Sequence, residues 1–139
     1  GVLHVVDSVR GLVLRYAPDG QWLPPLGGPG RGPGQFVRPR SIACTPSGAV
    51  LVTDAARQSV QVFGRDGRFV TEIHERSPWT GWSPPSGIIA IAGDDPLIHG
   101  PVTAQNWPAA DDYLLVSDSL GAAPLTLLGV QMNPAEVSP

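Results

Sequence analysis

One pattern occurs three times along this chain, and it restricts the possible folds more than any other feature. In each copy a short apolar run leads into an aspartate, at Asp7, Asp54 and Asp118. A large apolar residue follows nine residues after each aspartate, at Tyr16, Phe63 and Leu127. Two copies then turn on an Asp-Gly pair, and these two turns lie 47 residues apart. A period of this size, built from short strands, indicates a repeat protein whose blades follow one another along the chain.

The middle copy predicts a complete antiparallel meander of four strands. Runs of β-branched and aromatic residues alternate with Gly, Pro and Asp turns, a pattern typical of strands joined by tight turns. The strands are expected within 34–43 and over 50–54, 59–63 and 68–74. A four-stranded unit repeated at this period predicts an all-β fold made of β-propeller blades.

The middle copy also closely resembles an NHL repeat. It contains the Gly-x-Phe start at Gly34 and Phe36, the proline Pro39, a Ser-Ile-Ala strand, a Val-Thr-Asp strand end and a Ser-Val-Gln-Val-Phe third strand. The resemblance covers 34–70, and it covers 1–23 as a repeat without its first strand. It implies a partial β-propeller of NHL-like four-stranded blades, similar to those of tripartite-motif proteins and of bacterial six-bladed propellers. The expected divisions are a partial blade with a Gly/Pro-rich connection (1–33), a complete repeat (34–76) and a divergent third blade (77–139).

The third copy differs from the others by an insert. The stretch from Pro85 to Ile91 matches the first strand of the middle copy, but its strand-ending aspartate lies 18 residues further on than in the middle copy. The added residues, about 93–112, include His99 and Trp107. If the insert projects from the blade, these two side chains are candidates for contact with a partner.

The recurring aspartates are interpreted as structural. An Asp at a strand end accepts hydrogen bonds from the backbone N–H groups of the following turn. A group needed for this purpose occurs in every blade, whereas a catalytic group need occur only once. Asp7, Asp54 and Asp118 are therefore assigned to turns, and no catalytic residue is assigned.

Composition restricts the setting of the protein. The chain has 139 residues, of which 42% are hydrophobic, and it has a single cysteine, Cys44. No run is long enough to cross a membrane, and no signal segment opens the sequence. One cysteine cannot form an intramolecular disulfide, so a reducing, cytoplasmic location is expected. A ring needs about four to eight blades, so the chain is expected to be a fragment of a longer propeller or to self-associate to complete a ring.

Charge is unevenly distributed between the two halves of the chain. Residues 1–76 contain all nine arginines and six acids, a net charge of +3, whereas residues 77–139 contain six acids and no Lys or Arg. The blade pattern brings five of the arginines to one rim, at Arg10, Arg31, Arg38, Arg40 and Arg57. Arginine binds phosphates through two nitrogens and stacks on unpaired bases. Some NHL domains read RNA with such a face, so the resemblance makes RNA or another polyanion a possible ligand.

Three function classes remain at this point. A non-catalytic module that binds a protein partner is favoured, because propeller faces present loops to partners. RNA binding is the first alternative, although the sequence is acidic overall (pI about 5.4), and nucleic-acid domains tend to be basic. A propeller enzyme of the lyase or lactonase type is the second. The three histidines do not fall where a metal site at the channel would need them, so no metal, cofactor or catalytic role is expected. No membrane contact is expected either, because no run is long enough to cross a membrane.

Overall fold

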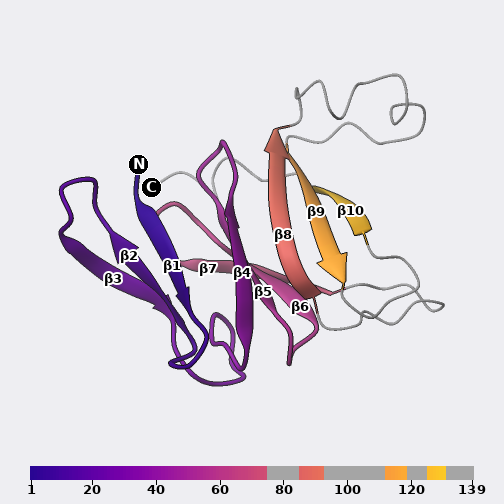
Figure 1. Ribbon diagram of the computed structural model, residues 1–139, viewed down its shortest axis with the longest axis horizontal. Helices are drawn as coiled ribbons and strands as arrows, with labels where there is room; N and C mark the ends of the chain where they lie inside the picture. Colours follow the sequence, from indigo (N-terminus) through magenta and orange to yellow (C-terminus); the bar gives the residue numbers. More distant parts are fainter. Residues whose placement is uncertain (75–84, 93–111, 119–124, 131–139) are drawn as a thin grey trace.

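The computed structural model describes residues 1–74, 85–92, 112–118 and 125–130 (Figure 1). Within these ranges the chain forms three antiparallel sheets that lie side by side (Figure 1). The first sheet contains β1 (Leu3–Asp7), β2 (Leu12–Tyr16) and β3 (Trp22–Gly27). The middle sheet contains β4 (Pro39–Cys44), β5 (Val50–Asp54), β6 (Ser59–Phe63) and β7 (Phe69–His74). The third contains β8 (Pro85–Ala92), β9 (Asp112–Asp118) and β10 (Leu125–Val130), so the predicted all-β class is confirmed.

The middle sheet is the four-stranded meander that the sequence predicts. Its strands are hydrogen-bonded in chain order, and β5 and β6 have the predicted bounds. β4 is shorter than the predicted stretch of 34–43, because residues before Pro39 belong to the connection from the first sheet. In that connection Phe36 forms a parallel bridge with Pro29, and Gly34 has a φ of 73°, which lies outside the extended conformation of a regular strand.

Two apolar clusters hold the sheets together. One contains Val13 and Leu26 of the first sheet with Phe36, Val52 and Phe63, and it fills the space between the first and middle sheets. The other contains Leu51, Val60, Val62 and Ile88, and it joins the middle and third sheets. Neighbouring residues of β5 thus point to opposite faces, as strand geometry requires. All five residues of β5 and of β6 are buried, because the middle sheet is covered on both sides.

The first two sheets repeat one turn after the strand-ending aspartate. The fourth residue after Asp7 is Gly11, with a φ of 67°, and the fourth residue after Asp54 is Gln58, with a φ of 54°. Equivalent positions therefore share the left-handed conformation, which favours glycine. Across the described ranges the chain contains no helix long and apolar enough to cross a membrane.

Candidate functional site

Three segments meet at one end of the first and middle sheets. They are the turn 8–11, the connection together with the first two residues of β4 (28–40) and the turn 55–58, and we call the surface that they form the loop rim. The hydroxyl of Ser8 donates to the carbonyl of Pro39 at 2.7 Å, which ties the first turn to the start of β4. The amide of Ala55 donates to the carbonyl of Arg38 at 3.0 Å, which ties the third segment to the second. The rim is therefore a bonded unit rather than three separate loops.

The two described aspartates shape the turns of the loop rim. Oδ1 of Asp7 accepts hydrogen bonds from the amides of Val9 (3.1 Å) and Arg10 (2.9 Å). Oδ1 of Asp54 accepts the equivalent bonds from Ala56 (3.0 Å) and Arg57 (3.1 Å). Both carboxylates have the turn-forming contacts that the sequence analysis assigns to them. Asp118 ends β9, but its side chain lies outside the described part of the chain.

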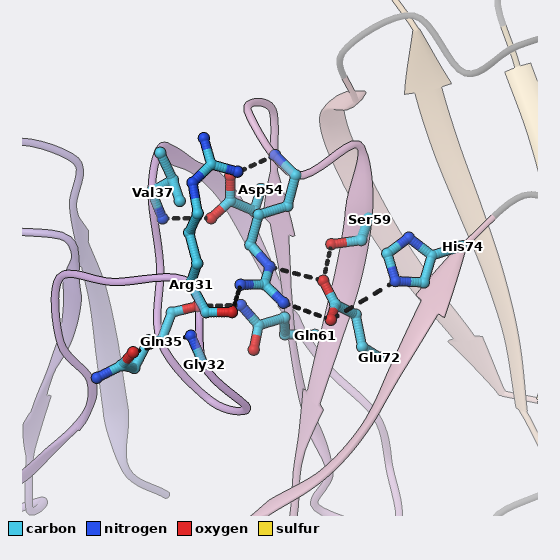
Figure 2. A network of polar contacts seen from close by, with 10 residues as sticks. Arg31, Gly32, Gln35, Val37, Asp54, Ser59, Gln61, Glu72 and His74 are labelled. Carbon is cyan, nitrogen blue, oxygen red and sulfur yellow. Dashed lines mark hydrogen bonds and ion pairs between the residues drawn. The ribbon is translucent and has the colours of Figure 1, made fainter.

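Asp54 has a second role that the sequence analysis did not predict. Its carboxylate is fully buried and also accepts a bond from the amide of Val37 (2.7 Å) in the connection (Figure 2). The amide of Arg38, the next residue, donates to the same carboxylate at 3.1 Å. The buried Gln61 of β6 supports the same connection by donating from Nε2 to the carbonyl of Gln35. The Gly/Pro-rich connection is thus held in place by side chains from two strands of the middle sheet.

Arg57, predicted to bind a ligand, makes contacts within the molecule through its guanidinium nitrogens. Its Nε and Nη2 donate to the two carboxylate oxygens of Glu72 at 2.7 and 2.6 Å, and its Nη1 donates to the carbonyl of Arg31 at 2.6 Å (Figure 2). Its side chain is only 12% exposed. The ion pair forms because the turn that carries Arg57 leads into β6, and β6 pairs with β7, which carries Glu72.

Glu72 is the centre of a small polar network. Besides Arg57, the hydroxyl of Ser59 donates to its Oε1, and Nε2 of His74 lies 3.5 Å from its Oε2 (Figure 2). The hydrogen bonds between Arg57 and Glu72 are the main cause of two pKa shifts. They lower the pKa of Glu72 to about 2 and raise the pKa of Arg57. Both groups stay charged at neutral pH, so the network is an anchor rather than an acid or base.

The other four predicted arginines remain available to solvent. Arg31, Arg38 and Arg40 are exposed, and none of them takes part in an ion pair among the described residues. The Arg10 side chain is 71% exposed, with its Nη1 3.8 Å from Oδ2 of Asp7. The loop rim therefore keeps four accessible guanidinium groups and not the five that the sequence suggests.

Two exposed valines of the loop rim were not predicted from the sequence. Val9 is 97% exposed in the first turn, and Val37 is 37% exposed in the connection. The repeat could have drawn attention to Val9, because the equivalent residue in the middle copy, Ala56, has a smaller side chain. Phe36 is buried and packs against Phe63 with ring centroids 5.6 Å apart.

The remaining candidates fall elsewhere. His99 and Trp107 lie outside the described residues, so their partner-binding assignment stays a prediction. Within the described ranges, no three His, Cys, Asp or Glu side chains come together to hold a metal ion. Cys44 ends β4 and is exposed, with Sγ 3.7 Å from Nδ1 of His4. Burial raises the pKa of the Cys44 thiol, while burial and then Arg15 lower the pKa of His4, so the surroundings disfavour the charged form of both groups.

Solved structures resemble this arrangement of sheets. Hydrazine synthase of Kuenenia stuttgartiensis matches with a TM-score of 0.58 and 19% identity, over 85% of this chain and 26% of that one. Virginiamycin B lyase of Staphylococcus aureus matches with a TM-score of 0.52 and 16% identity, over 98% of this chain and 40% of that one. The chain folds as part of a β-propeller.

At these identities the likeness concerns the fold alone. The chain spans less than half the length of either matched structure. No protein-family model matches the sequence, and neither does any curated protein sequence. The loop rim of this chain therefore has to be interpreted from its own residues.

Proposed function

We propose that this chain contributes NHL-like blades to a propeller that binds a protein partner through the loop rim. The observation that carries the proposal is the chemistry of the rim, where the exposed Val9 and Val37 lie on segments that also present exposed arginines. Arginine is enriched in protein interfaces, whose buried centre is more apolar than the rest of the surface, so exposed arginines beside exposed valines fit a protein partner. The partner that fits is a segment with acidic and apolar side chains.

The rigidity of the rim supports this proposal. Hydrogen bonds from Ser8 to Pro39 and from Val37 to Asp54 fix the turn and the connection that carry the exposed residues. A surface that is ordered before binding loses less conformational entropy when a partner docks. The Arg57–Glu72 pair adds to this order, because Arg57 also holds the carbonyl of Arg31.

RNA binding remains the second candidate, since four exposed guanidinium groups could bind phosphates. The loop rim lacks the other half of an RNA site, because none of its residues is an exposed aromatic. Phe36 is buried, and the exposed Trp22 belongs to β3, where it packs against Tyr16. Stacking platforms are the usual source of affinity for single-stranded bases.

The test compares two variants of equal charge. One carries Val9→Ser, Arg38→Glu and Arg40→Glu on the loop rim, and the control carries Arg65→Glu and Arg68→Glu in the β6–β7 turn at the opposite end of the sheet. Peptides are selected on the wild-type protein from a random display library. The proposal expects acidic, apolar peptides that bind the wild type and the control but not the rim variant.

Two results would overturn the protein-binding role. One is that no peptide is selected, and the other is that selected peptides bind both variants equally well. If instead a labelled single-stranded RNA binds, with an affinity that falls steeply with salt and is lost in the rim variant, RNA is the ligand.

A further inference from the structure

The positive charge of the loop rim is largely uncompensated. Its three segments contain five arginines and no Asp or Glu. Two neighbouring acids are already occupied, because Asp54 accepts four backbone amides and Glu72 binds Arg57. The third, Asp7, reaches the rim only through a long contact of 3.8 Å between its Oδ2 and Nη1 of Arg10. The negative charge that balances the remaining arginines must therefore come from the partner.

The opposite end of the middle sheet has a different balance of charge. Two exposed arginines, Arg65 and Arg68, lie there on either side of Asp66 in the β6–β7 turn. Nε of Arg68 is 3.5 Å from Oδ2 of Asp66, so part of this charge is paired within the turn. Unpaired arginine is thus concentrated at the loop rim, and the opposite turn provides a matched control.

Three of the exposed arginines start close to a single hydrogen bond. The hydroxyl of Ser8 donates to the carbonyl of Pro39 at 2.7 Å, which joins two segments of the rim. Arg38 and Arg40 flank Pro39 in the chain, and Arg10 is two residues after Ser8. All three arginines are exposed, whereas Pro39 between two of them is buried. Three long cationic side chains therefore begin around one fixed point and can approach the same small ligand.

A phosphate monoester suits three guanidinium groups better than a carboxylate does. A carboxylate carries one negative charge on two oxygens, which a single arginine can bind through two N–H groups. A phosphorylated serine or threonine carries a charge of about −1.5 to −2 at pH 7 and has three strong acceptor oxygens. Clusters of arginine are a recurring means of recognising phosphorylated motifs in peptides.

We infer that the partner of the loop rim carries a phosphoserine or phosphothreonine that binds among Arg10, Arg38 and Arg40. The exposed Val9 and Val37 each directly precede one of these arginines in the chain. Apolar residues beside the phosphorylated residue of the partner therefore contact the two valines, since a short phosphorylated side chain keeps its neighbours near the surface. This inference rests on the proposed protein-binding role and specifies the chemistry of the partner.

The experiment starts from a peptide selected on the wild-type protein from the display library. Each acidic position of the peptide is made phosphoserine in turn, with glutamate and serine in two matched peptides. Fluorescence anisotropy measures the binding of each fluorescein-labelled peptide to the intact chain. At one position or more, the phosphoserine peptide is expected to bind about tenfold more tightly than the glutamate peptide, and the serine peptide to bind most weakly.

The pH dependence gives a second reading of the same interaction. The second pKa of a phosphate monoester is about 6, so the advantage of phosphoserine over glutamate should shrink between about pH 7.5 and about pH 5.5. The affinity of the glutamate peptide should stay nearly constant over this range, because the ordinary pKa of glutamate is about 4.3. An advantage that does not change with pH would contradict direct recognition of the phosphate charge.

Two protein variants with the same change of charge identify the arginines. Arg38→Gln with Arg40→Gln should reduce the preference for phosphoserine over glutamate to about twofold or less, because two of the three forks are removed. Arg65→Gln with Arg68→Gln, in the β6–β7 turn, should keep the full preference.

The outcomes separate this inference from the proposed function. Equal binding of the phosphoserine and glutamate peptides at every position would overturn the phosphate inference, and so would a full preference in the rim variant. The loop rim would still bind acidic peptides in both cases, so the proposed function would stand. If no peptide is selected, both are wrong. A single-stranded RNA that binds the loop rim more tightly than every phosphoserine peptide would make nucleic acid the ligand and also overturn the inference.

Discussion

The carboxylate of Asp54 lies 2.7 Å from the backbone nitrogen of Val37, so the end of β5 is bonded to the connection that leads into its own sheet. The same buried carboxylate accepts the amides of Arg38, Ala56 and Arg57. One side chain therefore fixes both the turn that follows β5 and the segment that precedes β4. Asp7 shares the turn contacts, which the amides of Val9 and Arg10 make.

Replacing Asp54 should cost far more stability than replacing Asp7. Asp54→Ala leaves four amides without their charged acceptor in a buried place, so we expect the free energy of unfolding to fall by on the order of 4 kcal/mol. Asp7→Ala removes two bonds in an accessible turn and should cost about 1 kcal/mol. Urea denaturation followed by circular dichroism measures both values. Equal losses for the two variants would show that the connection does not depend on Asp54.

Acid should weaken the fold through Glu72. Its pKa is about 2 in the folded protein against an ordinary value of 4.5, and a group with a depressed folded pKa stabilises the fold above its unfolded pKa. That contribution is complete above about pH 5 and is lost as the pH falls from 4.5 toward 2. Glu72→Gln cannot titrate and leaves Arg57 without its carboxylate, so we expect it to be less stable at pH 7 by about 3 kcal/mol.

The difference between wild type and Glu72→Gln is therefore expected to shrink between pH 5 and pH 2. Urea denaturation at several pH values measures this difference in the free energy of unfolding. The control is the corresponding difference between wild type and Asp66→Asn, because Asp66 lies in an exposed turn. A difference that stays constant across this range would mean that the Arg57 bonds do not depend on the charge of Glu72.

The repeat made the strands of the middle sheet and the turn-forming aspartates predictable from the sequence. Alternating apolar residues and regular turns determine local strands, and the recurrence of Asp7 and Asp54 at one offset reveals their common turn. The five arginines could be assigned to one rim by the same register. These features depend on residues close together in the chain.

What the sequence did not reveal depends on pairing between distant residues. Arg57 meets Glu72 because the turn before β6 lies beside β7 once these two strands pair, and the sequence does not reveal this ion pair. The contacts from Asp54 to Val37 likewise link residues on different segments. Val9 is exposed because of the backbone conformation of its turn, and composition alone does not predict this exposure.

Gly27 should not tolerate a side chain. Its φ is 76°, and a Cβ there would lie 2.3 Å from Cε2 of Phe36, which is fixed in the core. Gly27→Ala therefore combines left-handed backbone strain of about 1–2 kcal/mol with overpacking of about 1–3 kcal/mol. Gly20→Ala is the matched control, because Gly20 has a φ of 84° but no atom within 4 Å of its Cβ position. Thermal unfolding should show the larger loss for Gly27→Ala, and equal losses would mean that Phe36 moves aside.

The thiol of Cys44 should react slowly despite its exposure. Burial raises its pKa above the ordinary value of 9.0, and the pKa of the neighbouring His4 is lowered, so burial disfavours the imidazolium that would stabilise a thiolate. We expect alkylation by iodoacetamide at pH 7 to be slower in the folded protein than in urea, where the thiol has its ordinary pKa. Mass spectrometry across a pH series measures both rates. His4→Ala should leave the folded rate unchanged or raise it, since the ring contributes to the burial of the thiol. A folded protein that reacts faster than the unfolded one, and loses this advantage in His4→Ala, would instead mean that His4 activates Cys44 as a nucleophile.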